Sequence, residues 1–440
     1  MLAERGHDVR VILPFYRTIR ESHLPVADAG EATIPWPGGD MPVRFLSHTP
    51  EHGAPGVLVD HAGFFDTLHP YGTAAEDPVW TGVRYAFFSR AVVAYARSWG
   101  ADVVHLNDWQ TGLVPVYGLL DGMPAATVFA VHNLAYQGNF PSPVLDAIGI
   151  PRGFLRQENG LEFWGKASFM KAGLALADRL VTVSPTYATE IQTHEFGNGF
   201  DGLLRFRHRV LSGILNGIDR QLWNPLTDPA LAVRYDARTV GAKDENRVAL
   251  LRELGLEGRG PLLALVTRLA YQKGIDLLLD ALPEILELGA DLAIVGDGDL
   301  AYEAVLAEAA VAYPGRIAID IGFNDTLARR LYAGADFFLM PSRYEPCGLG
   351  QLIAQRYGTP PVVHRTGGLL DTVVNGQTGY CFEEPTPQAL VAGLRRAFRG
   401  WRGGRWNALR RRCMGLEWSW DRSAAQYEDV YRVAIGRVGV

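Results

Sequence analysis

A carboxylate and a glycine-rich turn stand side by side in residues 341–352, PSRYEPCGLGQL. The apolar run 335–340 before them has the pattern of a parallel strand buried on both faces. Glu345 then follows the carboxyl end of that strand, and Gly348 and Gly350 open a helical pattern. Ligands of open α/β sheets bind at this end of the strands, and free N–H groups at the start of a helix attract phosphate. The segment therefore predicts a carboxylate beside an anion-binding loop.

Cations follow a second buried-strand pattern, Leu262–Val266. Arg268 and Lys273 come after it and are expected to leave the strand end in the same direction. Only four of the 42 basic residues are lysines, which makes a retained lysine informative. Lysine is a compact point charge suited to a phosphate oxygen. A solvated loop lysine is the alternative, but the Glu345 segment on a neighbouring strand end favours phosphate contact.

The composition is that of an ordinary globular protein, with 440 residues, 48% hydrophobic and 20% charged. The length predicts two or three domains. A net charge of −6 gives no overall attraction to nucleic acid or to an anionic membrane. No apolar run approaches the roughly 18 residues that span a bilayer, and the first residues lack a signal-peptide core. Three cysteines without a CxxC pair fit a reducing cytoplasm, so we expect a cytoplasmic protein without a disulfide framework.

Strand and helix patterns alternate in both halves of the chain, which predicts parallel sheets covered by helices. The fold class expected is α/β, with two doubly wound Rossmann-like domains facing a central cleft. Asn216, Gly217 and the prolines that follow interrupt the pattern and give the best domain boundary. Strands are expected at 9–13, 43–47, 57–60, 103–106, 127–131, 180–183, 262–266, 292–295, 317–320, 337–340 and 361–363, and helices at 85–98 and 163–177.

Further polar residues follow strands of the first half. Asp108 comes after the strand at 103–106, and His132 and Asn133 come after the strand at 127–131. A satisfied structural histidine is the alternative, but two polar clusters on one sheet edge favour a site. In the second half, Gly367 and Gly368 repeat the strand-to-glycine pattern and could offer more N–H groups to an anion.

Several other chemistries lack their motifs. The sequence has no GxxxxGK[ST] for P-loop nucleotide binding and no HExxH for a catalytic metal. The run 296–301 fails GxGxxG at its last position, so nicotinamide binding is unsupported. Cys347 lies in the glycine turn, where a packed, inert thiol is favoured over a reactive one.

Taken in order, these segments resemble the family of bacterial glycogen synthases and plant starch synthases over nearly the whole chain. The resemblance implies the two-Rossmann-domain glycosyltransferase fold (GT-B). It also implies retaining transfer of glucose from ADP-glucose to an α-1,4-glucan. The implied domains are 1–217 on the acceptor side, 218–417 for the nucleotide sugar, and a helix at 418–440 that crosses back. The segments that carry the resemblance are 132–138, 183–188, 215–219, 267–269, 272–274, 341–352 and 365–369.

The resemblance also implies roles for residues. Arg268 and Lys273 would hold the diphosphate, and Glu345 would hold sugar hydroxyls and stabilise positive charge on the ring. His132 would contact the donor glucose, and Asp108 would shape that pocket. The remaining expected substrate-binding residues are Asn133, Asn216, Phe323 (stacked on the nucleobase), Cys347, Gly348, Leu349, Gly350, Gly367 and Gly368. Leaving-group charge and ring charge both grow in the transition state, so fixed charges of this kind accelerate the step.

No metal and no other cofactor is expected for this chemistry. The expected partners are ADP-glucose and a glycogen or malto-oligosaccharide acceptor, with no nucleic acid and no membrane. Same-face attack with the leaving phosphate as base is preferred, and a covalent glycosyl-Glu345 route stays open.

Two departures from the family pattern affect the expectations. The family often has Thr at the position of Gly350, and its members begin with a strand and a Lys-x-Gly-Gly-Leu loop, whereas this sequence opens near the family's second strand. We therefore expect a truncated amino terminus and weaker activity or solubility than in a longer form. The alternative functions are a related retaining transferase with another acceptor, such as one that makes a disaccharide, and a catalytically impaired glucan-binding protein. Base selectivity between ADP and UDP donors stays open.

Overall fold

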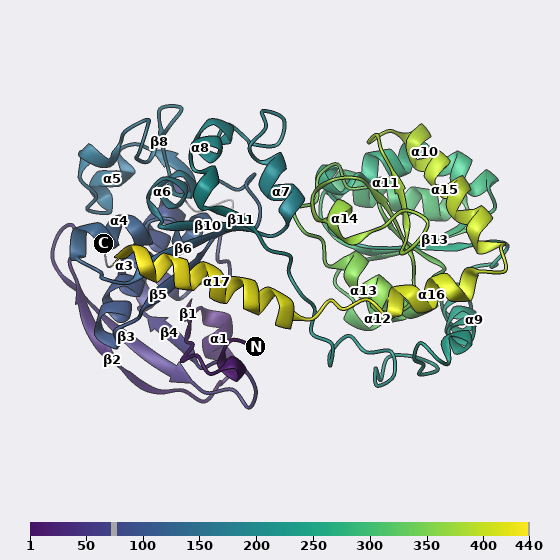
Figure 1. Cartoon of the computed structure of the whole chain (residues 1–440), viewed down its shortest axis with the longest axis horizontal. Helices are drawn as coiled ribbons and strands as arrows, with labels where there is room; N and C mark the ends of the chain where they lie inside the picture. The colour runs from purple at the N-terminus through teal and green to yellow at the C-terminus, as the bar shows by residue number, and fades with distance from the viewer. Residues whose placement is uncertain (72–76, 439–440) are drawn as a thin grey trace. The chain divides into compact units, whose positions relative to one another are not determined.

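The computed structural model describes residues 1–71 and 77–438, so residues 72–76 of the predicted first domain and 439–440 of the predicted final helix lie outside it. The chain divides into two compact units, coloured along the sequence in Figure 1. The first unit contains Met1–Val183, Ala188–Ile214 and Ala424–Val440. The second unit contains Ser184–Tyr187 and Leu215–Ser423.

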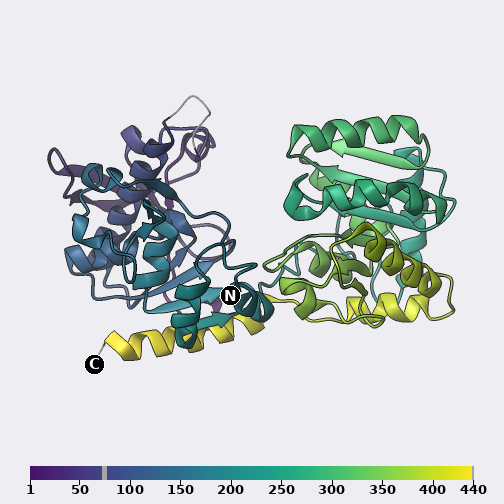
Figure 2. The ribbon, with the colours of Figure 1, turned by 90° about the horizontal axis from the view of Figure 1, so that it is seen from above.

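The second unit is built on one six-stranded parallel sheet. In the two ribbon views, helices lie on both faces of this sheet (Figures 1 and 2). In spatial order the strands are β14 (Ile317–Ile321), β13 (Asp291–Gly296), β12 (Leu262–Val266), β15 (Phe337–Met340), β16 (Pro361–His364) and β17 (Tyr380–Phe382).

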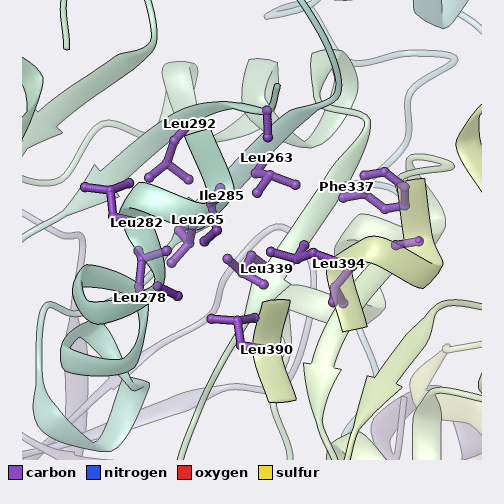
Figure 3. Close-up of a cluster of buried hydrophobic side chains, with 14 of the residues drawn as sticks. Leu263, Leu265, Leu278, Leu282, Ile285, Leu292, Phe337, Leu339, Leu390 and Leu394 are labelled. Carbon is purple, nitrogen blue, oxygen red and sulfur yellow. The ribbon is translucent and has the colours of Figure 1, made fainter. Parts of the chain in front are cut away.

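Both faces of this sheet are buried because successive strand side chains point to opposite sides. Leu263 and Leu265 of β12 pack in one apolar cluster with α10 (Ile275–Glu287) and α15 (Pro387–Trp401), as Figure 3 shows. Leu262 and Ala264 pack in the opposite cluster, which includes residues of α9 (Lys243–Leu254), α12 (Asp325–Gly334) and α13 (Gly350–Arg356). Each leucine buried in this way contributes about 1.5–3 kcal/mol, so the strand order is strongly fixed. The other helices of this unit are α11 (Leu300–Ala312), α14 (Gly367–Thr372) and α16 (Trp406–Met414).

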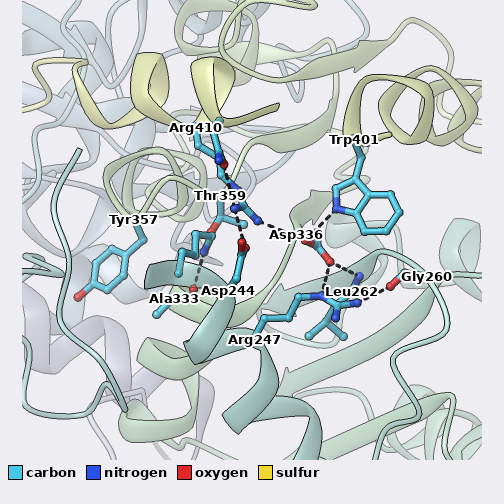
Figure 4. Close-up of polar contacts among 12 residues, drawn as sticks. Asp244, Arg247, Gly260, Leu262, Ala333, Asp336, Tyr357, Thr359, Trp401 and Arg410 are labelled. Atoms are coloured by element: carbon cyan, nitrogen blue, oxygen red, sulfur yellow. Dashed lines mark hydrogen bonds and ion pairs between the residues drawn. The ribbon is translucent and has the colours of Figure 1, made fainter. Parts of the chain in front are cut away.

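A buried carboxylate fixes the amino end of β15 (Figure 4). Asp336 accepts hydrogen bonds from Arg247 Nε at 2.8 Å, the N–H of Leu262 at 2.9 Å and Trp401 Nε1 at 3.0 Å. Arg410 adds a second cation beside it. A buried charge is tolerated only when it is paired and hydrogen-bonded in this way. With their amino ends held, β12 and β15 present their carboxyl ends in register.

The first unit holds two four-stranded sheets and a small three-stranded one. Part of the expected parallel arrangement is wrong here, because β2–β3 and β3–β4 pair antiparallel. The link between β3 and β4 is too short for the crossover that a parallel pair requires. The sheets have the orders β1 (Val11–Pro14), β4 (Gly56–Asp60), β3 (Met41–His48), β2 (Ala27–Ile34); β11 (Leu211–Gly213), β10 (Arg179–Thr182), β6 (Ala126–Val131), β5 (Val103–Asn107); and β7 (Asn139–Pro141), β9 (Lys166–Ser168), β8 (Glu162–Phe163).

The helix expected at 163–177 is shorter than predicted. Trp164 and Gly165, with φ of 51° and 77°, form a turn between β8 and β9. The helix α6 (Phe169–Leu176) begins only after Ser168, whose hydroxyl accepts a hydrogen bond from the N–H of Lys171. A positive φ favours turns over helix, and serine is a preferred helix N-cap. The apolar spacing therefore spans a hairpin and a helix.

The long helices of the first unit hold its sheets. The helix α3 (Pro78–Trp99) starts at the N-cap Asp77 and ends at Gly100. The helix α17 (Trp420–Val438) belongs to the first unit from Ala424 onward, and its Tyr427 packs against β6. None of the helices in the described residues is both long and apolar enough to cross a bilayer. The shorter helices are α1 (Arg17–Glu21), α2 (Ala62–Phe65), α4 (Val114–Asp121), α5 (Val144–Ala147), α7 (Pro185–Glu190) and α8 (Asp201–Phe206).

Candidate active site

An ion pair lies at the carboxyl ends of neighbouring strands in the second unit. Lys273 Nζ donates to Glu345 Oε2 at 2.6 Å, and Ser342 Oγ donates to the same oxygen at 3.0 Å. The two segments meet because β12 and β15 are adjacent in the sheet. Glu345 is 5% exposed. A buried carboxylate held by a lysine and a hydroxyl is a preorganised charge rather than a surface ion pair.

A glycine lets the lysine segment approach the chain directly after β15. The turn Tyr271–Lys273 ends at Gly274, which has a φ of 69°. A Cβ at Gly274 would lie 2.1 Å from the carbonyl oxygen of Pro341. Any other residue would therefore push the turn away from the Glu345 segment and lengthen the ion pair.

Arg268 lies on the same side of the sheet and is exposed. Its Nη2 donates to Gln272 Oε1 at 3.3 Å. The backbone carbonyl of Gln272 accepts a hydrogen bond from the N–H of Arg343 at 2.9 Å. The segment that carries both predicted cations is thus tied to the chain just before Glu345.

The carbonyl groups of the glycine-rich loop are held one after another by other parts of the unit. The carbonyl of Glu345 accepts from the N–H of Gly368 at 3.0 Å, and that of Pro346 accepts from Ser184 Oγ at 2.6 Å. The carbonyls of Cys347 and Gly348 both accept hydrogen bonds from the side-chain amide of Gln351. In the described part of the chain, the N–H groups of residues 348–350 donate to no other protein group. The loop therefore keeps backbone donors available for an anion.

Gln351, which supplies this side-chain amide, is a residue that the sequence analysis missed. Its Nε2 donates to Cys347 O at 2.9 Å, to Gly348 O at 3.1 Å and to Thr372 Oγ1 at 3.1 Å. Thr372 Oγ1 donates to the carbonyl of Gly368 at 2.6 Å, so Gln351 links the two glycine loops. Its Oε1 is buried and has no hydrogen-bond partner. The only signal in the sequence is a pair of glutamines one turn apart in a helix whose other residues before Arg356 are apolar or glycine.

Replacing Gln351 by Met should lower kcat/KM for the donor by about tenfold or more. The substitution keeps the length of the side chain but leaves two buried carbonyls without a donor, which costs about 1–3 kcal/mol. The loop carbonyls are then free to turn toward the anion site. The measurement is donor kinetics together with the melting temperature.

Gln355→Met is the matched control for this variant. Gln355 is fully buried one turn later and donates to the carbonyls of Thr372 and Thr378, away from the glycine-rich loop. Both variants should lose stability, but only Gln351→Met should lose turnover. Equal kinetic losses in the two would mean that Gln351 is structural only.

Other predicted residues lie around the same loop. The backbone of Asn216 hydrogen-bonds the thiol of Cys347, and burial raises the pKa of that thiol to about 12. Cys347 is therefore a packed thiol. Gly368 allows close contact, because a Cβ there would lie 2.2 Å from the carbonyl oxygen of Cys347. Gly367, with a φ of 46°, opens α14 beside it.

Two predicted residues of the second unit are exposed. Leu349 is 45% exposed in the loop, and Phe323 is 92% exposed just after the edge strand β14. Phe323 thus lies on the same edge of the sheet as Glu345 but at its margin. At Gly350, a Cβ would lie 2.8 Å from the ring of Phe338, so a threonine there would require that ring to move.

The remaining predicted residues lie in the first unit, at the carboxyl ends of β5 and β6. Asp108 Oδ1 accepts from the N–H of His132 at 2.8 Å and from the N–H of Asn133 at 3.5 Å. His132 Nε2 is 2.9 Å from Asn107 Oδ1. Burial raises the pKa of Asp108 above its ordinary value, while His132 acts in the opposite direction.

The backbone at Asp108 is strained, with φ 54° and ψ −173°. Only glycine adopts this region readily, and such strain costs of order 1–3 kcal/mol. Strained residues gather at functional sites, where the surrounding structure holds them in place. The structure thus joins Asp108, His132 and Asn133 into one cluster, and it places this cluster in a different unit from Glu345.

Comparison with known proteins agrees with this architecture. Residues 1–206 match the family model of the starch synthase catalytic domain, and residues 247–413 match glycosyl transferases group 1. A glycogen synthase of Syntrophotalea carbinolica is 42% identical over 98% of this chain and 92% of its own length. One from Anaeromyxobacter dehalogenans strain 2CP-1 is 46% identical over 99% and 94%.

Solved structures give the same result. The catalytic domain of starch synthase IV from Arabidopsis thaliana, bound to ADP and acarbose, superimposes with a TM-score of 0.89. It shares 30% identity and covers 99% of this chain and 94% of its own. Sucrose-phosphate synthase from Thermosynechococcus elongatus, at 20% identity and a TM-score of 0.60, shares the fold.

Two Rossmann-like units with charged groups at their strand ends define a glycosyltransferase of the GT-B class. The chain belongs to the family of bacterial glycogen synthases and starch synthases. The predicted fold class and the resemblance stated from the motifs are both confirmed.

Proposed function

We propose that this chain is a retaining glucosyltransferase that moves glucose from ADP-glucose to the non-reducing end of an α-1,4-glucan. The observation that carries the proposal is the ion pair between Lys273, which is partly buried, and the buried Glu345, beside a loop whose N–H groups are available. A nucleotide sugar brings two phosphates and a sugar ring that becomes positive as its bond breaks. At one edge of the sheet, cations and backbone donors can stabilise the negative charge on the leaving phosphate, and a carboxylate can stabilise the positive charge on the sugar ring.

In the proposed reaction, Arg268 and Lys273 bind the diphosphate. The bond between the anomeric carbon and the phosphate oxygen breaks, and its electron pair leaves with ADP. The N–H groups of Gly348, Leu349 and Gly350 take part of the new negative charge. The loop of Gly367 and Gly368 supports them, because the N–H of Gly368 donates to the carbonyl of Glu345. These charges interact more strongly with the transition state than with the bound donor, which is the condition for catalysis.

Glu345 is assigned to the sugar. Its Oε2 already accepts from Lys273 and Ser342, so the carboxylate is held as a fixed charge beside the ring. A fixed, hydrogen-bonded carboxylate favours charge stabilisation over the covalent glycosyl-Glu345 route. The acceptor hydroxyl then attacks on the face that ADP leaves and gives its proton to the departing phosphate, so the configuration is retained.

The other residues are assigned to substrate positioning. We assign His132, supported by Asp108, and Asn133 to the donor glucose, and Asn216 to the glucosyl region beside Cys347. Phe323 would stack on the base, since its ring is almost fully exposed. The proposed partners are ADP-glucose and glycogen or malto-oligosaccharide, with no nucleic acid or membrane, and the proposed location is the cytoplasm.

No metal is assigned to this reaction. Among residues 1–71 and 77–438, no group of three or more His, Cys, Asp or Glu side chains is placed to hold one. The proposal gives the neutralising role to Arg268, Lys273 and backbone donors instead. ADP-glucose itself is a substrate and not a cofactor.

Transfer of labelled glucose tests the proposal. The chain is incubated with labelled ADP-glucose or UDP-glucose and with glycogen or fructose 6-phosphate as acceptor. Label should enter glycogen from ADP-glucose faster than from UDP-glucose, and product analysis should show α-1,4 linkages. Label in a disaccharide would favour the alternative transferase. Glycogen binding without any transfer would favour a glucan-binding protein that lacks turnover.

A further inference from the structure

A pocket lies in the first unit, at the carboxyl ends of β1 and β4. It has a volume of about 320 Å³. Its walls come from Arg17, from α2 with the segment after it, and from the first turns of α3. The side chains used below are Arg17, Phe64, Asp66, His69, Trp80 and Arg84. None of them was singled out by the sequence.

A stack of three aromatic rings ends at this pocket. Phe87 and Phe64 are stacked at a centroid distance of 4.1 Å, with 13° between their planes. Phe64 and Trp80 continue the stack at 5.5 Å and 10°. Exposure rises along it from 0% at Phe87 through 5% at Phe64 to 40% at Trp80. The two buried rings fix the orientation of the Trp80 indole, and part of this indole is exposed in the pocket.

The exposed cation of the pocket, Arg17, is paired with a carboxylate. Arg17 Nε donates to Asp66 Oδ1 at 2.8 Å, and its Nη2 donates to the carbonyl of Asp66 at 3.0 Å. The buried Arg84 donates to the carbonyls of Phe64 and Pro70 and so fixes the wall behind the stack. A free cationic pocket would attract anions, but here the exposed cation is already paired. Hydroxyl groups, which both donate and accept, suit such a mixed set better.

We propose that this pocket is a binding subsite for the glucan acceptor, separate from the donor site. The apolar face of a glucosyl ring would stack on Trp80, and its hydroxyls would bond to Arg17, Asp66 and His69. A flat, rigid aromatic side chain gives large contact area at low entropic cost. The inference rests on the proposed function, because it takes the acceptor to be an α-1,4-glucan.

The pocket is linked to the Asp108 cluster through α3. Tyr85, one turn after Trp80 on this helix, lies with its hydroxyl 2.9 Å from that of Tyr16. The ring of Tyr85 meets that of Trp109, the neighbour of Asp108, at a centroid distance of 5.1 Å. One helix therefore supports both the pocket and the strained turn at Asp108.

The test compares Trp80→Leu with Trp80→Phe. Leucine keeps an apolar cover over Phe64 but removes the flat ring, and phenylalanine restores a ring. Trp80→Leu should weaken binding of glycogen and of maltoheptaose by about tenfold, measured by affinity electrophoresis and calorimetry. Trp80→Phe should recover part of this loss. Affinity for ADP should not change in either variant.

Trp164→Leu is the matched control. Trp164 is 82% exposed in the same unit, but it does not line this pocket. The control should bind glucan as the unchanged protein does. Kinetics should show the loss for Trp80→Leu in the KM of long acceptors, with a smaller effect on maltose.

The outcomes separate this subsite from the proposed function. Unchanged glucan affinity in Trp80→Leu, with transfer intact, would overturn the subsite and leave the function standing. An equal loss in Trp164→Leu would also overturn it, since the effect would then be general. Failure of the unchanged protein to bind or extend glucan would reject the proposed function itself.

Discussion

Replacing Glu345 by Gln should lower kcat for glucose transfer by about 10²- to 10³-fold, with a smaller change in the KM for ADP-glucose. The substitution keeps the shape of the side chain and removes its charge. The charge is needed most when the sugar ring becomes positive, and losing one such preorganised group costs about 2.7–4 kcal/mol. Initial rates over a range of ADP-glucose concentrations, with glycogen in excess, measure both constants.

Glu383→Gln is the control for this variant. Glu383 follows β17 on the same sheet, is exposed, and pairs with Arg365 at 3.0 Å. It should keep kcat within about twofold, as expected for an exposed pair worth about 0–1 kcal/mol. If Glu345→Gln changes only KM, Glu345 is a binding group and its role in stabilising ring charge is wrong.

Replacing Lys273 by Ala should lower kcat/KM for ADP-glucose by about 10²-fold or more. The variant loses a cation at the diphosphate, which is a few kcal/mol of electrostatic stabilisation. It also leaves the buried carboxylate of Glu345 without its ion-pair partner, so the melting temperature should fall. Arg268→Ala should show a kinetic loss of the same order with little change in stability, because Arg268 is exposed.

Lys166→Ala serves as the comparison for charge removal. Lys166 is exposed at the start of β9 in the first unit. It should have the kinetics of the unchanged protein. Unchanged kinetics in Lys273→Ala or Arg268→Ala would remove that residue from the diphosphate site, whatever happens to stability.

The strands of the second unit could be predicted closely from the sequence. The expected strand at 262–266 has the bounds of β12, and those at 337–340 and 317–320 differ from β15 and β14 by one residue at most. Buried parallel strands are continuous apolar runs, and this signal is strong. The strand β2, with the sequence ADAGEATI, was missed because it is a mostly exposed partner in an antiparallel pair with few large apolar residues.

The candidate site was predictable where strand order alone decides it. Glu345 and Lys273 meet because each follows a strand of the same parallel sheet and those strands are neighbours. Ser184 and Gln351 could not be found in this way. Their partners are backbone carbonyls of Pro346, Cys347 and Gly348, and a sequence carries no signal for which carbonyl turns toward which side chain.

The rarity of lysine proved informative in a second way. A second lysine, Lys243, is fully buried. Its Nζ donates to the carbonyl of Ala333 at 2.5 Å and to Thr359 Oγ1 at 2.6 Å. Burial lowers the pKa of Lys243 well below its usual value. Lys171 also donates to backbone carbonyls. Three of the four lysines, Lys171, Lys243 and Lys273, thus have defined partners, whereas Lys166 is exposed. The sequence alone does not separate a structural lysine from a phosphate ligand.

A crystal structure of the chain with ADP bound tests the central claim most directly. The account predicts the diphosphate within hydrogen-bond distance of Lys273 Nζ, the guanidinium of Arg268 and the N–H groups of residues 348–350. It also predicts the adenine ring against Phe323, with Glu345 beside the terminal phosphate where the glucose would lie. A diphosphate bound elsewhere, with Lys273 still paired only to Glu345, would contradict the account.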